Sequence, residues 1–170
     1  GSEMENGLSR LESLHFRLAA QIACLAWAFS DLAGRPGLVF EMGLGHGRSF
    51  DHLRRHLPDR EIYVFDRGVT SYPDCAPDAA YMIAGELGET LPAAARRFAG
   101  QVALAHSDVG SFDAGHNTRM AALVSAHLAP ALADGALVLS DLPLDLPGTT
   151  RLALPAGARQ DRYHAYRFRR

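Results

Sequence analysis

Short apolar runs alternate with amphipathic segments along most of the chain. The first run, Leu38-Val39-Phe40, has the length of a buried strand. The segment that follows repeats apolar residues every three or four positions as far as Leu57, which is typical of a helix that buries one face. Later apolar runs predict further strands at residues 60–66, 80–84, 102–108 and 136–141. Strands that alternate with helices in this way predict a mostly parallel sheet covered on both faces.

An amphipathic segment from Leu8 to Leu32 precedes the first strand. Its apolar positions follow helical spacing, at Leu11, Leu14, Leu18, Ile22, Leu25 and Phe29. Ser9 followed by Glu12 fits a capping box, in which each side chain bonds the main chain of the other residue. The sequence therefore predicts a long N-terminal helix whose apolar stripe packs on the rest of the protein.

Two later helices are marked by the residues that start and end them. Thr90 followed by Pro92 predicts the start of a helix that stops at Gly100. Asn117 predicts the cap of another helix, which ends near Gly135.

Two segments depart from a regular alternation of strands and helices. Residues 67–80 contain two prolines among small and polar residues, which predicts a short or irregular connection. Residues 151–154 and 163–168 flank a Pro-Ala-Gly turn, and they predict a closing hairpin.

Composition limits the kinds of protein that these elements can form. The 170 residues are 48% hydrophobic, which predicts one domain, residues 1–170, with a single sizeable core. A formal net charge of -2 argues against a nucleic-acid partner, because such domains are usually strongly basic. All 17 basic residues are Arg. The absence of Lys excludes Schiff-base chemistry and the phosphate-binding loop that ends in Lys.

The cysteines and the hydropathy of the chain give no sign of an extracellular or membrane protein. Cys24 and Cys75 lie far apart, without the spacing of a metal site or a disulfide framework. No uninterrupted apolar stretch reaches the roughly 20 residues that a membrane span needs, and the N-terminus lacks the layout of a signal peptide. We therefore expect a soluble, cytoplasmic protein without a membrane partner.

A run of alternating glycines follows the first predicted strand. Glu41 closes the strand, and Gly43, Gly45 and Gly47 come next. Glycine permits backbone conformations closed to other residues and leaves no side chain between the main chain and a ligand. A helix that starts at Arg48 would point its first N–H groups into the same space. This stretch predicts a loop that binds a cofactor through its main chain.

Residues Glu41 to Gly47 resemble the acidic-x-Gly-x-Gly-x-Gly motif of class I S-adenosylmethionine-dependent methyltransferases. The competing motif, the dinucleotide fingerprint G-x-G-x-x-G, would need a glycine at position 48. That position holds Arg48, so a nicotinamide-dependent reductase is disfavoured. A structural turn without a cofactor is the plain alternative for a motif this short.

Asp66 ends the second predicted strand, about 20 residues after the glycines, where a ribose-binding acid is expected in nucleotide-binding sheets. A carboxylate there can accept hydrogen bonds from both ribose hydroxyls. The alternative is a surface aspartate that opens a turn. The glycine turn and Asp66, at the expected separation, are together stronger evidence for a cofactor site than either feature alone.

The resemblance implies a fold and a cofactor. The fold is a Rossmann-like, doubly wound sheet of seven strands, mostly parallel, with a C-terminal antiparallel hairpin. The cofactor is S-adenosyl-L-methionine, and its implied contacts are Glu41, Gly43, Leu44, Gly45, Gly47, Arg48, Asp66 and Arg67, with Glu86 and Leu87 beside the adenine. In the family, helices like residues 1–36 often cover the cleft of the core, here residues 37–170. Packing on the sheet alone is equally open for this segment.

The end of the fourth predicted strand is the position that the family commonly uses near the transferable methyl. Here it holds His106 and Asp108, either of which could take a proton from an acceptor, and strand alternation places both on one face. Asp108 and Asp141 also end neighbouring strands, as do the Mg²⁺ ligands of catechol-type O-methyltransferases. Leu142 stands where those enzymes usually have Asn, so we expect no metal.

The implied activity is methyl transfer from S-adenosylmethionine to a nucleophile. A chain without an inserted substrate domain favours a small-molecule acceptor, or a pocket that a second subunit of a homo-oligomer completes. The sequence also leaves open a non-catalytic protein that senses S-adenosylmethionine or S-adenosylhomocysteine, or that binds them as a partner subunit.

Overall fold

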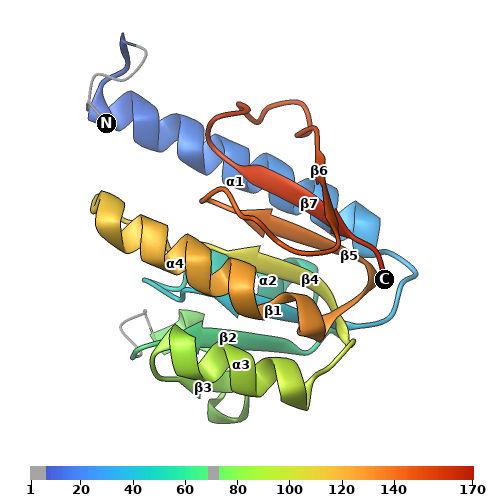
Figure 1. Cartoon of the computed structure of the whole chain (residues 1–170). Helices are drawn as coiled ribbons and strands as arrows, with labels where there is room; N and C mark the ends of the chain where they lie inside the picture. The colour runs from blue at the N-terminus through green and yellow to red at the C-terminus, as the bar shows by residue number, and fades with distance from the viewer. Residues whose placement is uncertain (1–6, 69–72) are drawn as a thin grey trace.

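The computed structural model describes residues 7–68 and 73–170, and one sheet of seven strands organises them (Figure 1). The strand order is β3-β2-β1-β4-β5-β7-β6. The strands are β1 (Leu38–Met42), β2 (Ile62–Asp66), β3 (Met82–Ala84), β4 (Val102–Ser107), β5 (Leu132–Ser140), β6 (Thr149–Leu152) and β7 (His164–Phe168). β1 to β5 pair in parallel, while β7 pairs antiparallel with both β5 and β6. The predicted fold, including the closing hairpin, is confirmed.

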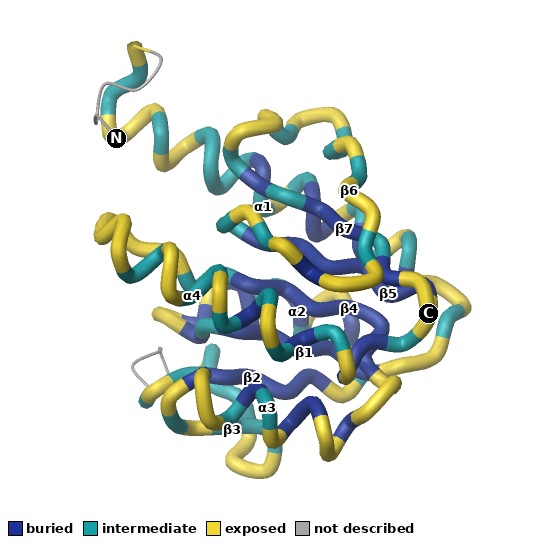
Figure 2. The backbone as a smooth tube through the Cα atoms, viewed as in Figure 1, coloured by how far each residue is buried: buried dark blue, intermediate teal, exposed yellow. Residues whose placement is uncertain are grey.

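Helices cover both faces of the sheet. α1 (Arg10–Leu32) and α2 (Arg48–His56) lie behind it in Figure 1, and α3 (Leu87–Arg97) and α4 (Ala114–His127) lie in front. Each face has its own buried cluster, because side chains alternate along the central strands. Every residue of β1 and β4 is buried, as the dark central strands of Figure 2 show. Polar residues at the ends of these strands are therefore held by a rigid, close-packed centre.

α1 begins as predicted but packs on a different face. Ser9 and Glu12 form the expected capping box. Leu11, Leu14 and Ile22, however, are 76%, 42% and 58% exposed, so half of the six predicted stripe positions do not pack on the sheet. The buried positions are mainly small residues, which let the helix approach the sheet closely, namely Ala20, Cys24, Leu25, Ala28 and Leu32. The sequence prediction missed the buried small residues of α1 because it was based on the spacing of the large apolar ones.

The predicted start of α3 was wrong. The helix begins at Leu87, and Thr90 bonds the carbonyl of Glu86 from inside its first turn. Pro92 therefore lies within the helix and not at its start.

The predicted cap of α4 was also wrong. Asp113 caps the helix by accepting from the N–H groups of Gly115 and His116. Asn117 instead bonds both main-chain groups of Ser111, which orders the loop ahead of the helix.

The strands also differ from prediction at their ends. β5 starts at Leu132 and not at residue 136, because α4 ends at His127 and a short 3-10 turn, η4 (Ala129–Ala131), leads directly into the strand. β4 stops at Ser107, so Asp108 lies just beyond it. The connection after β2 is irregular, as predicted, with short 3-10 turns at η2 (Pro73–Cys75) and η3 (Ala79–Tyr81), and residues 69–72 lie outside the described part.

None of the helices in the described residues is long and apolar enough to cross a membrane.

Candidate functional site

The glycine turn between β1 and α2 forms the floor of the candidate site. Gly43 has φ 97° and its N–H donates to Phe65 O over 2.8 Å, which ties the turn to the end of β2. A Cβ at Gly43 would overlap the carbonyl oxygen of Asp108, so only glycine fits where the turn meets the end of β4. A Cβ at Gly45, which has φ 52°, would meet open space. A ligand can therefore approach this part of the main chain.

The turn leads directly into α2. Gly47, with φ 88°, occupies the N-cap position, and no side chain caps the helix there. Arg48 is the first residue of the helix and is exposed. The start of α2 is thus a region of positive potential next to the glycine turn.

Asp66 lies beside the glycine turn, at the end of β2. Its Oδ1 accepts from Leu44 N over 3.4 Å, and its Oδ2 accepts from Gly68 N over 3.2 Å. The two segments that the sequence singled out are therefore neighbours in space. The Leu44 bond is long, and the half-buried carboxylate keeps capacity to accept further hydrogen bonds.

The remaining predicted cofactor residues lie at the ends of β2 and β3. Arg67 Nε is 3.1 Å from Glu86 Oε1, and both side chains are largely exposed. Leu87 is buried in the core beneath α3. The exposed ion pair borders the site, whereas the side chain of Leu87 packs inward.

A chain of buried hydrogen bonds runs behind the glycine turn. Glu41 Oε1 is 2.6 Å from His106 Nδ1, and His106 Nε2 is 2.7 Å from the Tyr163 hydroxyl. All three residues are fully buried. Glu41 lies in β1, His106 in β4 and Tyr163 immediately before β7, so the chain links β1 and β4 to the segment that leads into β7. Both ring nitrogens of His106 are engaged, which indicates a positioning role and not contact with substrate.

The Glu41–His106 pair is tightly coupled electrostatically. Burial would lower the pKa of His106, but the adjacent Glu41 carboxylate, helped by Asp108 and Asp141, raises that pKa to about 9. Burial raises the pKa of Glu41, and its contact with His106 opposes that rise. The raised pKa favours the protonated imidazole, which can donate from both ring nitrogens.

Asp108 is a partly exposed carboxylate just beyond β4. We call the edge of the sheet at the carboxyl ends of β4 and β5 the rim. Gln21 Nε2 donates to Asp108 Oδ2 over 3.1 Å and to the Tyr163 hydroxyl over 2.9 Å, so it links the rim to the buried chain. Arg17 Nη1 lies 3.7 Å from Asp108 Oδ1, which is a loose ion pair. The links from Asp108 through Gln21 and Tyr163 to His106 place the two predicted catalytic residues on one face, as strand alternation required.

Asp141 lies next to Asp108, just beyond β5. Its Oδ2 accepts from Gly110 N over 2.8 Å, and its buried Oδ1 makes no hydrogen bond. Burial, together with the charge of Asp108, raises the pKa of Asp141 to about 6. Across residues 7–68 and 73–170, no group of three or more His, Cys, Asp or Glu side chains is arranged to hold a metal ion.

Comparison with known proteins supplies the family. A model described as S-adenosyl-L-methionine methyltransferase matches residues 8–168. The crystal structure of an S-adenosyl-L-methionine methyl transferase from Silicibacter pomeroyi DSS-3 shares 43% identity and a TM-score of 0.90, over 94% of this chain and 98% of that one. The chain belongs to the S-adenosyl-L-methionine methyltransferases. S-adenosyl-L-methionine is accordingly its cofactor, and family membership favours an enzyme over the non-catalytic binding protein that the sequence left open.

Two more distant methyltransferase structures share the fold. A putative methylase from Haemophilus influenzae has a TM-score of 0.57 at 12% identity, over 89% of this chain and 99% of that one. A Burkholderia thailandensis 1,6-didemethyltoxoflavin-N1-methyltransferase has a TM-score of 0.52 at 14% identity, over 91% and 78% of the two chains. A comparison with curated proteins finds no match.

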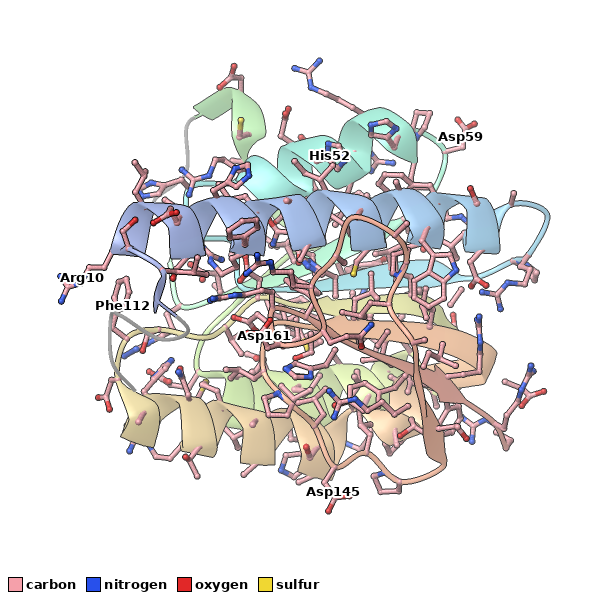
Figure 3. All side chains as sticks on the ribbon, turned by 90° about the horizontal axis from the view of Figure 1, so that it is seen from above. Arg10, His52, Asp59, Phe112, Asp145 and Asp161 are labelled. Carbon is pink, nitrogen blue, oxygen red and sulfur yellow. The ribbon has the colours of Figure 1, made fainter. Side chains whose placement is uncertain are left out.

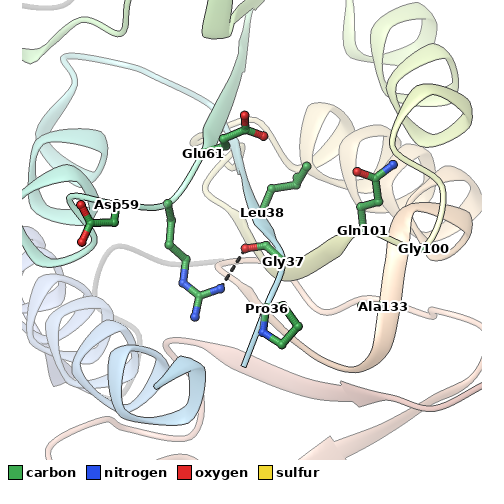
Figure 4. Close-up of a pocket in the computed structure, with 9 residues that line it drawn as sticks. Pro36, Gly37, Leu38, Asp59, Glu61, Gly100, Gln101 and Ala133 are labelled. Atoms are coloured by element: carbon green, nitrogen blue, oxygen red, sulfur yellow. Dashed lines mark hydrogen bonds between the residues drawn. The ribbon is translucent and has the colours of Figure 1, made fainter. Parts of the chain in front are cut away.

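A hollow in the surface of the methyltransferase lies at the opposite end of the sheet from this site (Figure 4). Its lining includes Gly37, Asp59 and Gln101, which precede β1, β2 and β4. Arg60 Nη1 donates to Gly37 O over 2.8 Å beside it, which closes the amino ends of the strands. Ligands of parallel sheets bind beyond the carboxyl ends, so we expect the methyl-transfer site at the other end of the sheet.

The sequence did not indicate three polar residues near the rim of the methyltransferase, namely Arg17, Gln21 and Tyr163. Arg17 and Gln21 are one helical turn apart on α1, and Tyr163 opens a terminal strand. None lies in a motif. They meet only when α1 packs on the sheet and Tyr163 reaches His106 of β4, which spacing along the chain does not reveal.

Replacing Gly43 by alanine is expected to destabilise the methyltransferase by about 1–3 kcal/mol, because the new Cβ meets main chain in a left-handed conformation. Chemical denaturation measures the loss. Gly88→Ala in α3 is the control, since its Cβ would make ordinary contact with Leu123 of α4. Equal stability of the two variants would contradict the close approach of Gly43 to Asp108.

The stability of the methyltransferase is expected to fall as pH rises. The folded-state pKa of His106, about 9, exceeds the ordinary 6.5, so its proton stabilises the fold at low pH and that contribution is lost as pH passes through about 9. Urea titrations between about pH 6.5 and about pH 9 should show this decline in wild type and in the exposed control His15→Gln. The same decline in His106→Gln would show that another group causes it.

Proposed function

We propose that this methyltransferase moves the methyl group of S-adenosyl-L-methionine to a hydroxyl or amine of a small molecule, at the rim beyond β4 and β5. The observation that carries the proposal is the placement of Asp108. Its main chain touches the glycine turn at Gly43, and its partly exposed carboxylate is held by Gln21 from α1. A carboxylate fixed beside a cofactor loop suits a group that orients or deprotonates an acceptor.

The cofactor side of the proposal rests on the neighbouring β1 and β2 ends. We assign the adenosyl end to the main chain of the glycine turn, residues 43–47, and of Arg48, which follows it. We assign the ribose hydroxyls to Asp66. The open space above Gly45 and the spare acceptor capacity of Asp66 fit that ligand.

The flanking residues complete the assignment of the cofactor site. Glu41 is fully buried and bonded to His106, so we assign it to holding the glycine turn from beneath and not to contact with the cofactor. The exposed Arg67–Glu86 pair would border the adenine. The buried side chain of Leu87 cannot do so, and we leave it out of the site.

The protein mainly has to position the reactants and exclude water. A bound sulfonium cofactor already carries an activated methyl group, so alignment supplies much of the rate. We assign α1 to a wall over the rim, because Arg17 and Gln21 of α1 reach Asp108. The hydrogen bonds that join His106 to Tyr163 and Tyr163 to Gln21 would fix the position of α1 on the sheet.

Asp66→Ala is expected to weaken binding of S-adenosylhomocysteine by about 1.5–3 kcal/mol, which is roughly a 10- to 150-fold rise in Kd. The reason is the loss of charge-assisted hydrogen bonds to the ribose. Calorimetry measures the change, with the exposed Asp59→Ala at the opposite end of the sheet as the matched control. Unchanged affinity in Asp66→Ala would remove this residue from the site.

Asp108→Asn is expected to lower methyl transfer by about 100-fold or more while leaving cofactor affinity within about twofold of wild type. The amide keeps the size of the side chain but cannot take a proton. The assay follows release of S-adenosylhomocysteine with a panel of phenols, catechols and primary amines. Equal turnover by wild type and variant, or no turnover by wild type with any acceptor of these classes, would contradict the proposal.

A further inference from the structure

Arg162, just ahead of β7, is an unusually enclosed cation. Among arginines in the described residues, it alone has buried guanidinium nitrogens, Nε and Nη2, without a hydrogen-bond partner. Its side chain is 13% exposed, and the acid within ion-pair reach is Asp161, whose Oδ2 lies 3.9 Å from Nε. A buried cation that lacks full pairing is costly to the fold. A bound anion would accept hydrogen bonds from these nitrogens and offset that cost.

Other partly buried arginines of the chain are satisfied from within. Arg60 donates to the carbonyls of Leu32, Arg35 and Gly37. Arg167 forms a double hydrogen bond with the carboxylate of Asp31 at 2.9 Å. The missing hydrogen bonds of Arg162 are therefore not a general property of arginine in this fold.

The segment that carries Arg162 is attached to α1 at two points. On its N-terminal side, the guanidinium of Arg159 lies 3.7 Å from the centre of the Phe16 ring, and Arg162 N donates to Arg159 O over 3.1 Å. On its C-terminal side, Tyr163 bonds Gln21 of α1. Figure 3 labels Asp161 in the loop that precedes β7. Arg162 is thereby fixed between the helix and the hairpin.

The same part of α1 carries a second cation. Arg17 follows Phe16 directly and stands one turn ahead of Gln21. Its contact with Asp108 is 3.7 Å long and its side chain is 38% exposed, so an incoming anion can share it at little cost. Three guanidinium groups, from Arg17, Arg159 and Arg162, thus belong to the α1 and β7 side of the rim.

We propose that Arg162, supported by Arg159 and Arg17, binds a carboxylate or phosphate group carried by the methyl acceptor. The inference rests on the proposed function, since it places the acceptor at the rim. The acceptor would then be bifunctional, with a nucleophilic hydroxyl or amine near Asp108 and an anionic group toward α1. Guanidinium suits this task because its planar fork matches both anions.

The position of Arg162 in the sheet separates this site from the cofactor loop. The glycine turn and Asp66 belong to β1 and β2, whereas Arg162 precedes β7, with β4 and β5 between β1 and β7. The methionine carboxylate of the cofactor is nevertheless an anion, so the test has to begin with the cofactor site filled.

The experiment uses the full chain saturated with S-adenosylhomocysteine. Inorganic phosphate and acetate are titrated at constant ionic strength, and Kd is read from the rise in Tm and from calorimetry. Wild type should bind at least one of the two anions saturably, and Arg162→Gln should weaken that binding at least tenfold. Arg96→Gln, which removes an exposed guanidinium at the far end of α3, should bind as wild type does.

Two results would overturn the inference, namely no saturable binding of either anion by wild type, or equal binding by wild type and Arg162→Gln. If Arg162→Gln does not fold, Arg17→Gln at the more exposed position takes its place, with at least a threefold loss expected and an unchanged Kd counting against the site. Binding of S-adenosylhomocysteine is recorded separately for every variant. Its absence in wild type would contradict the cofactor site, whereas its presence without an anion effect would contradict only Arg162.

Discussion

The main chain of Gly43 packs directly against the main chain of Asp108, and most of the candidate site follows from that contact. Asp108 N donates to Met42 O over 2.9 Å, so the end of β4 is tied to the point where β1 becomes the glycine turn. Any side chain at Gly43 would separate the two segments. The contact places the loop that is assigned to the cofactor within reach of the carboxylate that is assigned to the acceptor. Methyl transfer requires that proximity, because donor and acceptor must be aligned.

The buried chain from Glu41 to Tyr163 extends this contact across the sheet. Through His106 and Gln21, it connects the strand before the glycine turn with α1 and with the hairpin that ends the chain. Such a fully buried polar network tolerates little distortion, since each broken bond leaves a polar group without water. The network therefore gives α1 one defined position over the rim. It also links the residue just ahead of β7 to a site that begins at β1.

The parts of the fold that could be predicted from the sequence are those fixed by local chemistry. The glycine turn, Asp66 and the capping box at Ser9 follow from backbone freedom, from strand spacing and from reciprocal hydrogen bonds, and the structure has the turn beside Asp66. Helix starts at Leu87 and Ala114 were missed, because several residues near each start could serve as a cap and tertiary packing chose among them.

Properties that depend on long-range packing could not be predicted. The sequence suggested His106 as a catalytic base, but its burial between Glu41 and Tyr163 was not visible from strand alternation. The buried face of α1 consists mainly of small residues, which weigh little in a search for apolar stripes. The enclosed guanidinium of Arg162 likewise depends on how the hairpin meets the helix.

The most direct test of the account is a crystal structure of the protein with S-adenosylhomocysteine. We expect the ligand to lie on the main chain of residues 43–47, with both ribose hydroxyls bonded to the carboxylate of Asp66. Its sulfur should face the rim at Asp108. Binding in the hollow beside Arg60, or a ligand whose sugar makes no contact with Asp66, would contradict it.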